Sequence, residues 1–188
     1  MSTPATIAKF NKLSRGKQTL LIVGAGVTVS AILALLYREE IVETVKRFGP
    51  SGVRNNNPGN IRIDSSNWQG VVPVSENTDG RFHQFRDMLS GMRAHMVLLR
   101  NYQSKYGLDT IRKITRRWAP YGDGSNNPDN YAEFVASKVG ISPDQPINII
   151  ANTEVLAKIA HYMAIQENGW QWSVALSLDK YRKATRLL

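Results

Sequence analysis

The sequence predicts an α+β domain that is mostly helical, with a small antiparallel hairpin region, preceded by a single N-terminal transmembrane helix. Three observations support this fold class. Residues 19–37 form an apolar run without a charged side chain. Short stretches between residues 61 and 85 alternate apolar and polar residues, which is the period of a strand. From residue 88 onward, apolar residues recur at intervals of three and four, which is the period of an amphipathic helix.

The apolar run TLLIVGAGVTVSAILALLY is the expected membrane span. At 1.5 Å of rise per residue it would extend about 28 Å, close to the hydrocarbon thickness of a bilayer. A cleaved signal peptide is the alternative, but the run ends in Leu-Leu-Tyr-Arg instead of a small-residue cleavage site. Four basic residues and no acid precede the span, so the positive-inside rule predicts a cytoplasmic N-terminus.

These features divide the chain into four expected parts. Residues 1–18 form a basic N-terminal tail, and residues 19–37 form the transmembrane helix. Residues 38–51 form a juxtamembrane helix that ends in a Gly-Pro-Ser-Gly linker. Residues 52–188 form the folded domain, which is long enough to bury its own core.

Within the domain, the expected strands and helices follow in that order along the chain. Strands are expected over 61–64, 71–74 and 81–85, with a turn over 76–80. Helix signals then predict five helices. They cover 88–104, a segment from a cap at Asp109 to Trp118, 128–139 after the cap Asn127, a segment from Asn152 or Thr153 to about Gln166, and about 172–187.

Charge and composition restrict the function. The chain has 24 basic and 15 acidic residues and no cysteine, which excludes disulfides, thiolate nucleophiles and cysteine zinc sites. His83, His95 and His161 lie in separate segments, so no metal and no cofactor is expected. The net charge of +9 favours anionic partners: nucleic acid, lipid headgroups or cell-wall polymers.

Three clusters carry polar or aromatic chemistry, and each leaves two interpretations open. The amides of the segment 54–62, RNNNPGNIR, suit sugar hydroxyl and N-acetyl groups, but they also suit turns. The aromatic residues of 116–121, followed by Tyr131, can stack on sugars or fill the core. Glu167, at the end of a predicted helix, is either a catalytic carboxyl group or an exposed residue beside a glycine cap.

Several motifs in order resemble a family of phage virion proteins, whose members are described as structural proteins or presumed cell-wall hydrolases. The resemblance covers about residues 52–170. It rests on RNNNPGNIR, Trp68-Gln69-Gly70, Asp79–Phe85, Gly91–Ala94, Arg117–Pro120 and Glu167-Asn168-Gly169. It implies peptidoglycan, a lipid membrane and other virion proteins as partners.

A second resemblance is to lysozyme-like lytic transglycosylases. Gly80–Gln84 is similar to their hairpin pattern, Ser90–Leu99 to their glycine-bearing helix, and Tyr131 with Val135 to their tyrosine helix. Their catalytic helix, which ends in glutamate, does not precede the hairpin here. The helix that ends at Glu167 has that form, which suggests a circular permutation with Glu167 beside the 54–85 region.

The second resemblance implies a set of site residues. Glu167 is the expected catalytic acid, and Asp64 or Asp79 is the candidate second carboxylate. Without a second carboxylate, the acetamido group of the substrate would assist and an anhydro-sugar would form. The expected substrate-binding residues are Asn56, Asn60, Gln84, Trp118 and Tyr131.

The sequence therefore predicts a membrane-anchored, virion-associated peptidoglycan lytic enzyme, a lytic transglycosylase or lysozyme. It would reside in the virion membrane and act in the host cell envelope during entry, opening the wall locally for genome delivery. One alternative is a non-catalytic virion membrane protein that binds cell wall or viral DNA. Nucleic acid is the less favoured partner, and would be bound by Arg112, Lys113, Arg116 and Arg117.

Overall fold

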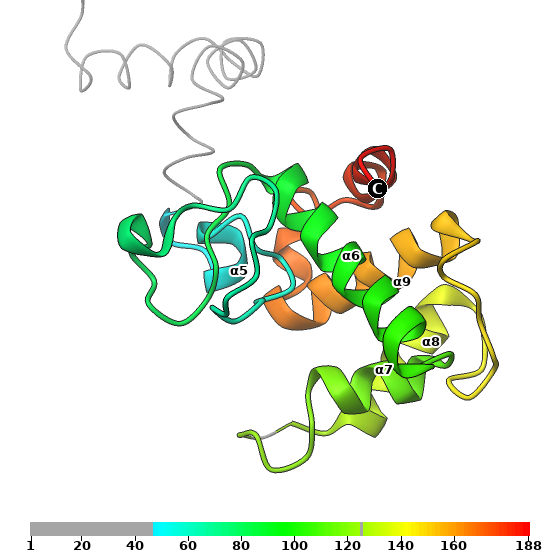
Figure 1. Cartoon of the computed structure of the whole chain (residues 1–188). Helices are drawn as coiled ribbons and strands as arrows, with labels where there is room; N and C mark the ends of the chain where they lie inside the picture. The colour runs from blue at the N-terminus through cyan, green and yellow to red at the C-terminus, as the bar shows by residue number, and fades with distance from the viewer. Residues whose placement is uncertain (1–46, 125) are drawn as a thin grey trace, which may run out of the picture. The chain divides into compact units, whose positions relative to one another are not determined.

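Helix α9 (Thr153–Asn168) is the central element of the fold (Figure 1). The computed structural model describes residues 47–124 and 126–188, and Gly49–Leu188 make up one compact unit. Helix α9 packs against four other helices, α5, α6, α8 and α10. Nine of its sixteen residues are buried, so it forms the interior of the unit and is not a surface helix.

The regular secondary structure of the described residues is helical. In chain order the elements are α5 (Ser51–Arg54), η1 (Val74–Glu76), α6 (Met88–Tyr106), α7 (Ile111–Trp118), α8 (Pro128–Val139), α9 (Thr153–Asn168), η2 (Trp170–Trp172) and α10 (Leu178–Thr185). The apolar core joins α9 to side chains of the other helices, among them Met92, Met96, Leu99, Ile111, Ile114, Val135 and Tyr181.

Local capping signals explain why most predicted helices form where the sequence places them. The predicted helix over 128–139 is confirmed: the Asn127 side chain accepts a hydrogen bond from the Asn130 amide, and Gly140 follows the helix in a left-handed conformation. The Asp87 side chain likewise caps α6. The predicted cap at Asp109 is wrong, because Thr110 caps α7. The predicted last helix is shorter and is preceded by η2.

The predicted antiparallel hairpin is wrong. The described residues contain no strand, and only isolated antiparallel bridges join Arg62 to Phe82 and Val71 to Phe85. The physical reason is competition from an amide side chain. Asn57 donates to the carbonyl groups of Ile61 and His83 and accepts from the Ile61 amide, so it occupies backbone groups that a continuous ladder would pair.

The predicted transmembrane helix receives no support from the structure. Residues 19–37 lie outside the residues that the structure describes, as does most of the predicted segment 38–51. Within residues 47–124 and 126–188, no helix is both long enough and apolar enough to cross a bilayer.

Helix α6 contacts the loop that follows α5 through a glycine. A β-carbon added at Gly91 would lie 1.7 Å from the backbone oxygen of Asn56, a distance that no van der Waals contact allows. Because the obstacle is backbone, it cannot turn aside as a flexible side chain would. The close approach of α6 to this loop therefore depends on the absence of a side chain at residue 91.

We expect Gly91→Ala to lower the free energy of unfolding by about 3 kcal/mol, because the methyl group pushes α6 away from the loop. Urea denaturation measures the change. Ser104→Ala on the same helix is the matched control, since Ser104 is exposed, and it should change the free energy of unfolding by less than about 0.5 kcal/mol. Equal stability of the two variants would contradict the close packing described above.

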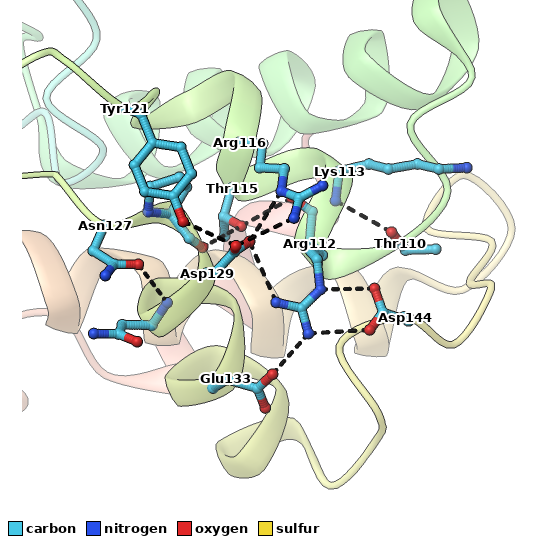
Figure 2. Close-up of polar contacts among 12 residues, drawn as sticks. Thr110, Arg112, Lys113, Thr115, Arg116, Tyr121, Asn127, Asp129, Glu133 and Asp144 are labelled. Atoms are coloured by element: carbon cyan, nitrogen blue, oxygen red, sulfur yellow. Dashed lines mark hydrogen bonds and ion pairs between the residues drawn. The ribbon is translucent and has the colours of Figure 1, made fainter.

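A cluster of ion pairs joins α7 to α8 and to the loop before α9 (Figure 2). The Arg112 guanidinium contacts carboxylate oxygens of Asp144 at 2.8 Å, Glu133 at 2.7 Å and Asp129 at 3.3 Å. Asp129 also accepts hydrogen bonds from Arg116 and from the Tyr121 hydroxyl group. These bonds, with that of Arg116 the largest, lower the pKa of Asp129 from 3.8 to about 2.

A lowered carboxyl pKa stabilises the fold above the unfolded-state value and stops doing so as pH falls through the folded-state value. We therefore expect the stability difference between the wild type and Asp129→Asn to be constant above about pH 4 and to shrink between about pH 4 and pH 2. Urea denaturation at a series of pH values measures it. Glu76→Gln, at an exposed residue without an ion pair among the described residues, is the control for the removal of one carboxylate.

Candidate active site

Glu167 lies in the last turn of α9 and receives hydrogen bonds from three separate segments. The Asn60 amide group donates to Oε2 at 3.1 Å, and the Trp118 indole N–H donates to Oε1 at 3.0 Å. The Tyr131 hydroxyl group lies 3.1 Å from the same Oε1. These partners come from the loop after α5, the end of α7 and the buried side of α8, so the fold brings together residues that lie 107, 49 and 36 positions from Glu167.

The Glu167 carboxylate faces a cleft of about 750 Å³. The 59–68 loop forms one wall, and the C-terminal half of α6 with the end of α7 forms the other. The cleft therefore lies between the irregular N-terminal part of the unit and its helices. Its volume is in the range typical of small-molecule and substrate sites.

The residue after Glu167 holds one wall of the cleft in place. The Asn168 amide nitrogen is buried and donates to the carbonyl group of Pro58 at 2.9 Å and to that of Ala164 at 2.8 Å. It thereby fixes the 54–62 loop to α9 one residue away from the carboxylate. Gly169 follows with φ +91°, where a side chain would be strained. Each residue of Glu-Asn-Gly thus has a separate role.

The sequence left open whether the amides of the 54–62 segment form turns or serve a binding site, and the structure shows amides of both kinds. Asn55, Asn56 and Asn57 maintain the loop: their amide nitrogens donate to Asp79, to the carbonyl group of Phe85 and to two backbone carbonyl groups respectively. Asn60, with φ +49°, contacts Glu167. One amide therefore belongs to the site, and the others build the loop that presents it.

The five predicted substrate-binding residues do not form one group. Asn60, Trp118 and Tyr131 meet at Glu167, where Asn60 and Trp118 line the cleft and Tyr131 is buried outside its lining. Asn56 is bonded to the Phe85 carbonyl group and does not line the cleft. Gln84 also lies outside the lining and joins Thr78 to Asn55. Asn56 and Gln84 therefore hold the loops before α6 together and do not contact the site.

The two candidates for a second carboxylate also lie in different surroundings. Asp64 lines the cleft with Glu167, and its oxygens contact His83 Nε2 at 3.0 Å and the amide and hydroxyl groups of Ser66. Burial raises its pKa, but these hydrogen bonds outweigh that effect and the net pKa is lowered. Asp79 lies outside the cleft lining and holds the 77–82 turn through hydrogen bonds from Asn55 and the Phe82 amide.

The Tyr131 hydroxyl group can form its hydrogen bond to Glu167 in two ways. Its single proton has two acceptors within 3.1 Å, the Met163 carbonyl oxygen and Glu167 Oε1. Tyr131 can donate to an ionised Glu167, or donate to Met163 and accept from a protonated Glu167. Burial, followed by the charge of Glu167, raises the pKa of Tyr131 well above 10, so its hydroxyl group stays neutral throughout.

Trp118 is held by residues behind it. The His95 ring packs against the indole with the ring centroids 4.8 Å apart, and His95 Nδ1 lies 3.2 Å from the Tyr181 hydroxyl oxygen. Burial lowers the pKa of His95 to about 3, so a neutral imidazole supports the indole at neutral pH. A β-carbon at Gly59 would collide with both rings, so the loop can pass this close only with glycine there.

Sequence reasoning missed several residues of the cleft. Tyr102, Tyr106 and Lys105 of α6 line it, as does Asp123, which pairs with Arg62. The helical period marked Tyr102 only as an apolar residue of an amphipathic face, and nothing local marked the others. Among the described residues, no group of three or more His, Cys, Asp or Glu side chains is placed to hold a metal ion.

Fold and site together define a helical domain whose central helix ends in a carboxylate facing a cleft. No family model matches the chain. Protein P5 of Pseudoalteromonas phage PM2 is 34% identical over 145 residues, which cover 76% of this chain and 82% of P5. The chain belongs to the same family of phage proteins as P5. This relationship confirms the phage part of the predicted resemblance, while the likeness to lytic transglycosylases and the circular permutation stay hypotheses.

We expect Tyr131→Phe to lower the free energy of unfolding by about 1–2 kcal/mol, because the Met163 carbonyl group and Glu167 both lose a buried partner. Chemical denaturation measures the loss. Tyr121→Phe is the matched control: it removes a hydroxyl group bonded to Asp129 at an exposed position and should cost about 0.5 kcal/mol or less. The same loss in both variants would show that the buried hydroxyl group has no special role.

Proposed function

We propose that this protein is a virion-associated enzyme that cleaves peptidoglycan between N-acetylmuramic acid and N-acetylglucosamine, opening the host wall locally for genome delivery. The observation that carries the proposal is the Glu167 carboxylate, held by three donors from separate segments at the edge of a cleft. Membership of a phage protein family supports the virion context.

The partners of Glu167 suit a group that exchanges a proton. None of Asn60, Trp118 and Tyr131 is a cation, and the described residues include no Lys, Arg or His in an ion pair with Glu167. A cation beside a carboxylate favours its charged form, and Glu167 is bonded to no cation in the described part of the chain. The two-acceptor arrangement at Tyr131 makes each state compatible with the same side-chain positions.

In the proposed mechanism, protonated Glu167 donates its proton to the glycosidic oxygen as the bond to the departing sugar breaks. The positive charge that develops on the remaining sugar is stabilised by Asp64 or by the acetamido oxygen of the substrate. Glu167, now ionised, accepts a proton from the incoming oxygen. If that oxygen belongs to water the product is a free sugar, and if it is the sugar's own hydroxyl group the product is an anhydro-sugar.

The two proposed routes differ in whether Asp64 or the acetamido group of the substrate stabilises the positive charge on the sugar. Asp64 shares the cleft with Glu167, and the hydrogen bonds from His83 and Ser66 favour its ionised form. A route through Asp64 requires that charge, whereas a route through the acetamido group does not. Mass spectrometry of the released fragments from Asp64→Asn therefore distinguishes a loss of cleavage from continued formation of anhydro-sugar.

We expect Glu167→Gln to reduce wall cleavage by about 10²–10⁴-fold, the usual contribution of a general acid. Release of soluble muropeptides from purified peptidoglycan measures the activity. Glu154→Gln is the matched control, because Glu154 is exposed in the first turn of the same helix and forms an ion pair with Arg182 on α10. Unfolding curves verify that both variants fold, and unchanged cleavage by Glu167→Gln would refute the assignment.

The charges of α7 weigh against the nucleic-acid alternative. Arg112 and Arg116 are paired with acids of α8 and the following loop, and Lys113 is paired with Asp109 at 2.7 Å. Their charges are therefore largely neutralised within the chain. Phosphate-driven binding needs several cations that gain a new partner on contact, and paired cations gain little.

A further inference from the structure

One cation of α7 differs from its neighbours on the helix. The Arg117 guanidinium lies over the Tyr106 ring at 3.9 Å and over the Tyr102 ring at 5.1 Å, measured to the ring centroids. Tyr106 is 55% exposed, and all three side chains line the cleft that contains Glu167. A guanidinium carries five N–H donors, so contact with the two rings leaves N–H groups available to a ligand.

The charge at this end of the cleft is not compensated. Lys105 lines the cleft beside Tyr106, and the part of the chain that the structure describes has no carboxylate in an ion pair with Lys105 or Arg117. By contrast, Arg62 in the same cleft is paired with Asp123. An arginine in contact with two rings, in a cleft that a lysine also lines and without an acid partner in the described chain, can bind an anion.

The polar residue Asn101 extends this surface along α6. Asn101 and Lys105 are four residues apart, so they lie on the same face of the helix, and both line the cleft. Tyr102 and Tyr106 repeat that spacing one residue later. The C-terminal turns of α6 thus present amide, aromatic and cationic groups on one surface. These groups together are suited to binding an acidic sugar.

We infer that the α6–α7 end of the cleft, formed by Asn101, Tyr102, Lys105, Tyr106 and Arg117, binds a carboxylate group of the wall polymer. The inference rests on the proposed function and deepens it. A polymer of N-acetylglucosamine alone is neutral, whereas peptidoglycan carries carboxylates on the lactyl group of muramic acid or on its stem peptide. Arg117 would recognise that group with two parallel N–H donors, and Tyr106 would pack against the sugar or peptide.

Binding of three soluble probes tests the inference without requiring turnover. The full chain carrying Glu167→Gln is titrated calorimetrically with an N-acetylglucosamine tetramer, a peptide-free muramic acid tetrasaccharide and the same tetrasaccharide bearing stem peptides. We expect at least one carboxylate-bearing probe to bind about tenfold or more tightly than the neutral tetramer, since hydrogen bonds between charged groups are stronger than neutral ones. Preference for the peptide-free probe identifies the lactyl carboxylate, and preference for the peptide-bearing probe alone identifies the peptide.

Variants in the same background assign the preference to residues. Arg117→Gln should reduce the preference to about twofold or less, and Arg117→Lys should retain only part of it, because an ammonium group provides no bidentate fork. Lys138→Gln is the matched control: its ammonium group also lies over aromatic rings, Phe134 and Trp170, but outside the cleft lining. It should leave the preference unchanged.

The possible outcomes separate this inference from the proposed function. Equal affinity for all three probes, no binding of any probe, or a preference that survives Arg117→Gln each overturns the inference. Wall cleavage by the wild type without any preference would refute only the inference. A preference that depends on Arg117, in a wild-type chain that releases no muropeptides, would refute only the enzymatic proposal.

Discussion

The structure of the site depends on the hydrogen bond between the buried Asn168 amide and the Pro58 carbonyl group. It fixes an irregular loop to the end of the central helix, beside Glu167. Asn60 can reach Glu167 only because the loop lies against α9 at this point. The close approaches at Gly52 and Gly91, where a β-carbon would collide with Asn168 and with the Asn56 backbone, show how little space the attachment leaves.

Hydrogen bonds of side-chain amides therefore stabilise the region before α6, in place of the backbone hydrogen bonds that join strands in a sheet. Asn55 and Asn57 bond to backbone and side-chain groups on both sides of the loop, and Gln84 extends this network to the 77–82 turn. A buried polar network of this kind requires nearly complete satisfaction, since each unpaired group costs free energy. The network favours one conformation of the loop, and in that conformation the Asn60 side chain is directed at the Glu167 carboxylate.

The electrostatics of the two sides of α7 differ. On the side facing α8, Arg112 and Arg116 are neutralised by Asp129, Glu133 and Asp144, and these ion pairs tie the helices together. On the cleft side, Arg117 is supported by aromatic rings. The cleft thus combines the Glu167 carboxylate, bonded to neutral donors, with a cation that has no acid partner in the described part of the chain. The relationship to protein P5 of phage PM2 places this cleft in a phage protein.

Much of the fold was determined by local signals in the sequence. The caps Asn127 and Asn152, the glycine after Val139 and the apolar period of three and four residues are each read from neighbours along the chain, and they place α6, α8 and α9 within a few residues. The Glu-Asn-Gly ending and the resemblance of its helix to a catalytic one selected Glu167. The alternation over 61–64 and 81–85 predicted strands that do not form. The Asn57 side chain, which lies shortly before the first segment, competes for the backbone groups of Ile61.

Tertiary structure decided which of the candidate residues share a site. No local signal distinguishes Asn60 from Asn56, or Asp64 from Asp79, since each pair has the same chemistry in similar surroundings along the chain. The docking of the loop on α9 turns Asn60 toward Glu167 and directs Asn56 to the Phe85 carbonyl group. Likewise, Arg116 and Arg117 are chemically identical but lie on different faces of α7. Arg117 contacts two tyrosines, whereas Arg116 pairs with an aspartate. Contacts between residues distant in sequence set these differences, and a one-dimensional pattern does not contain them.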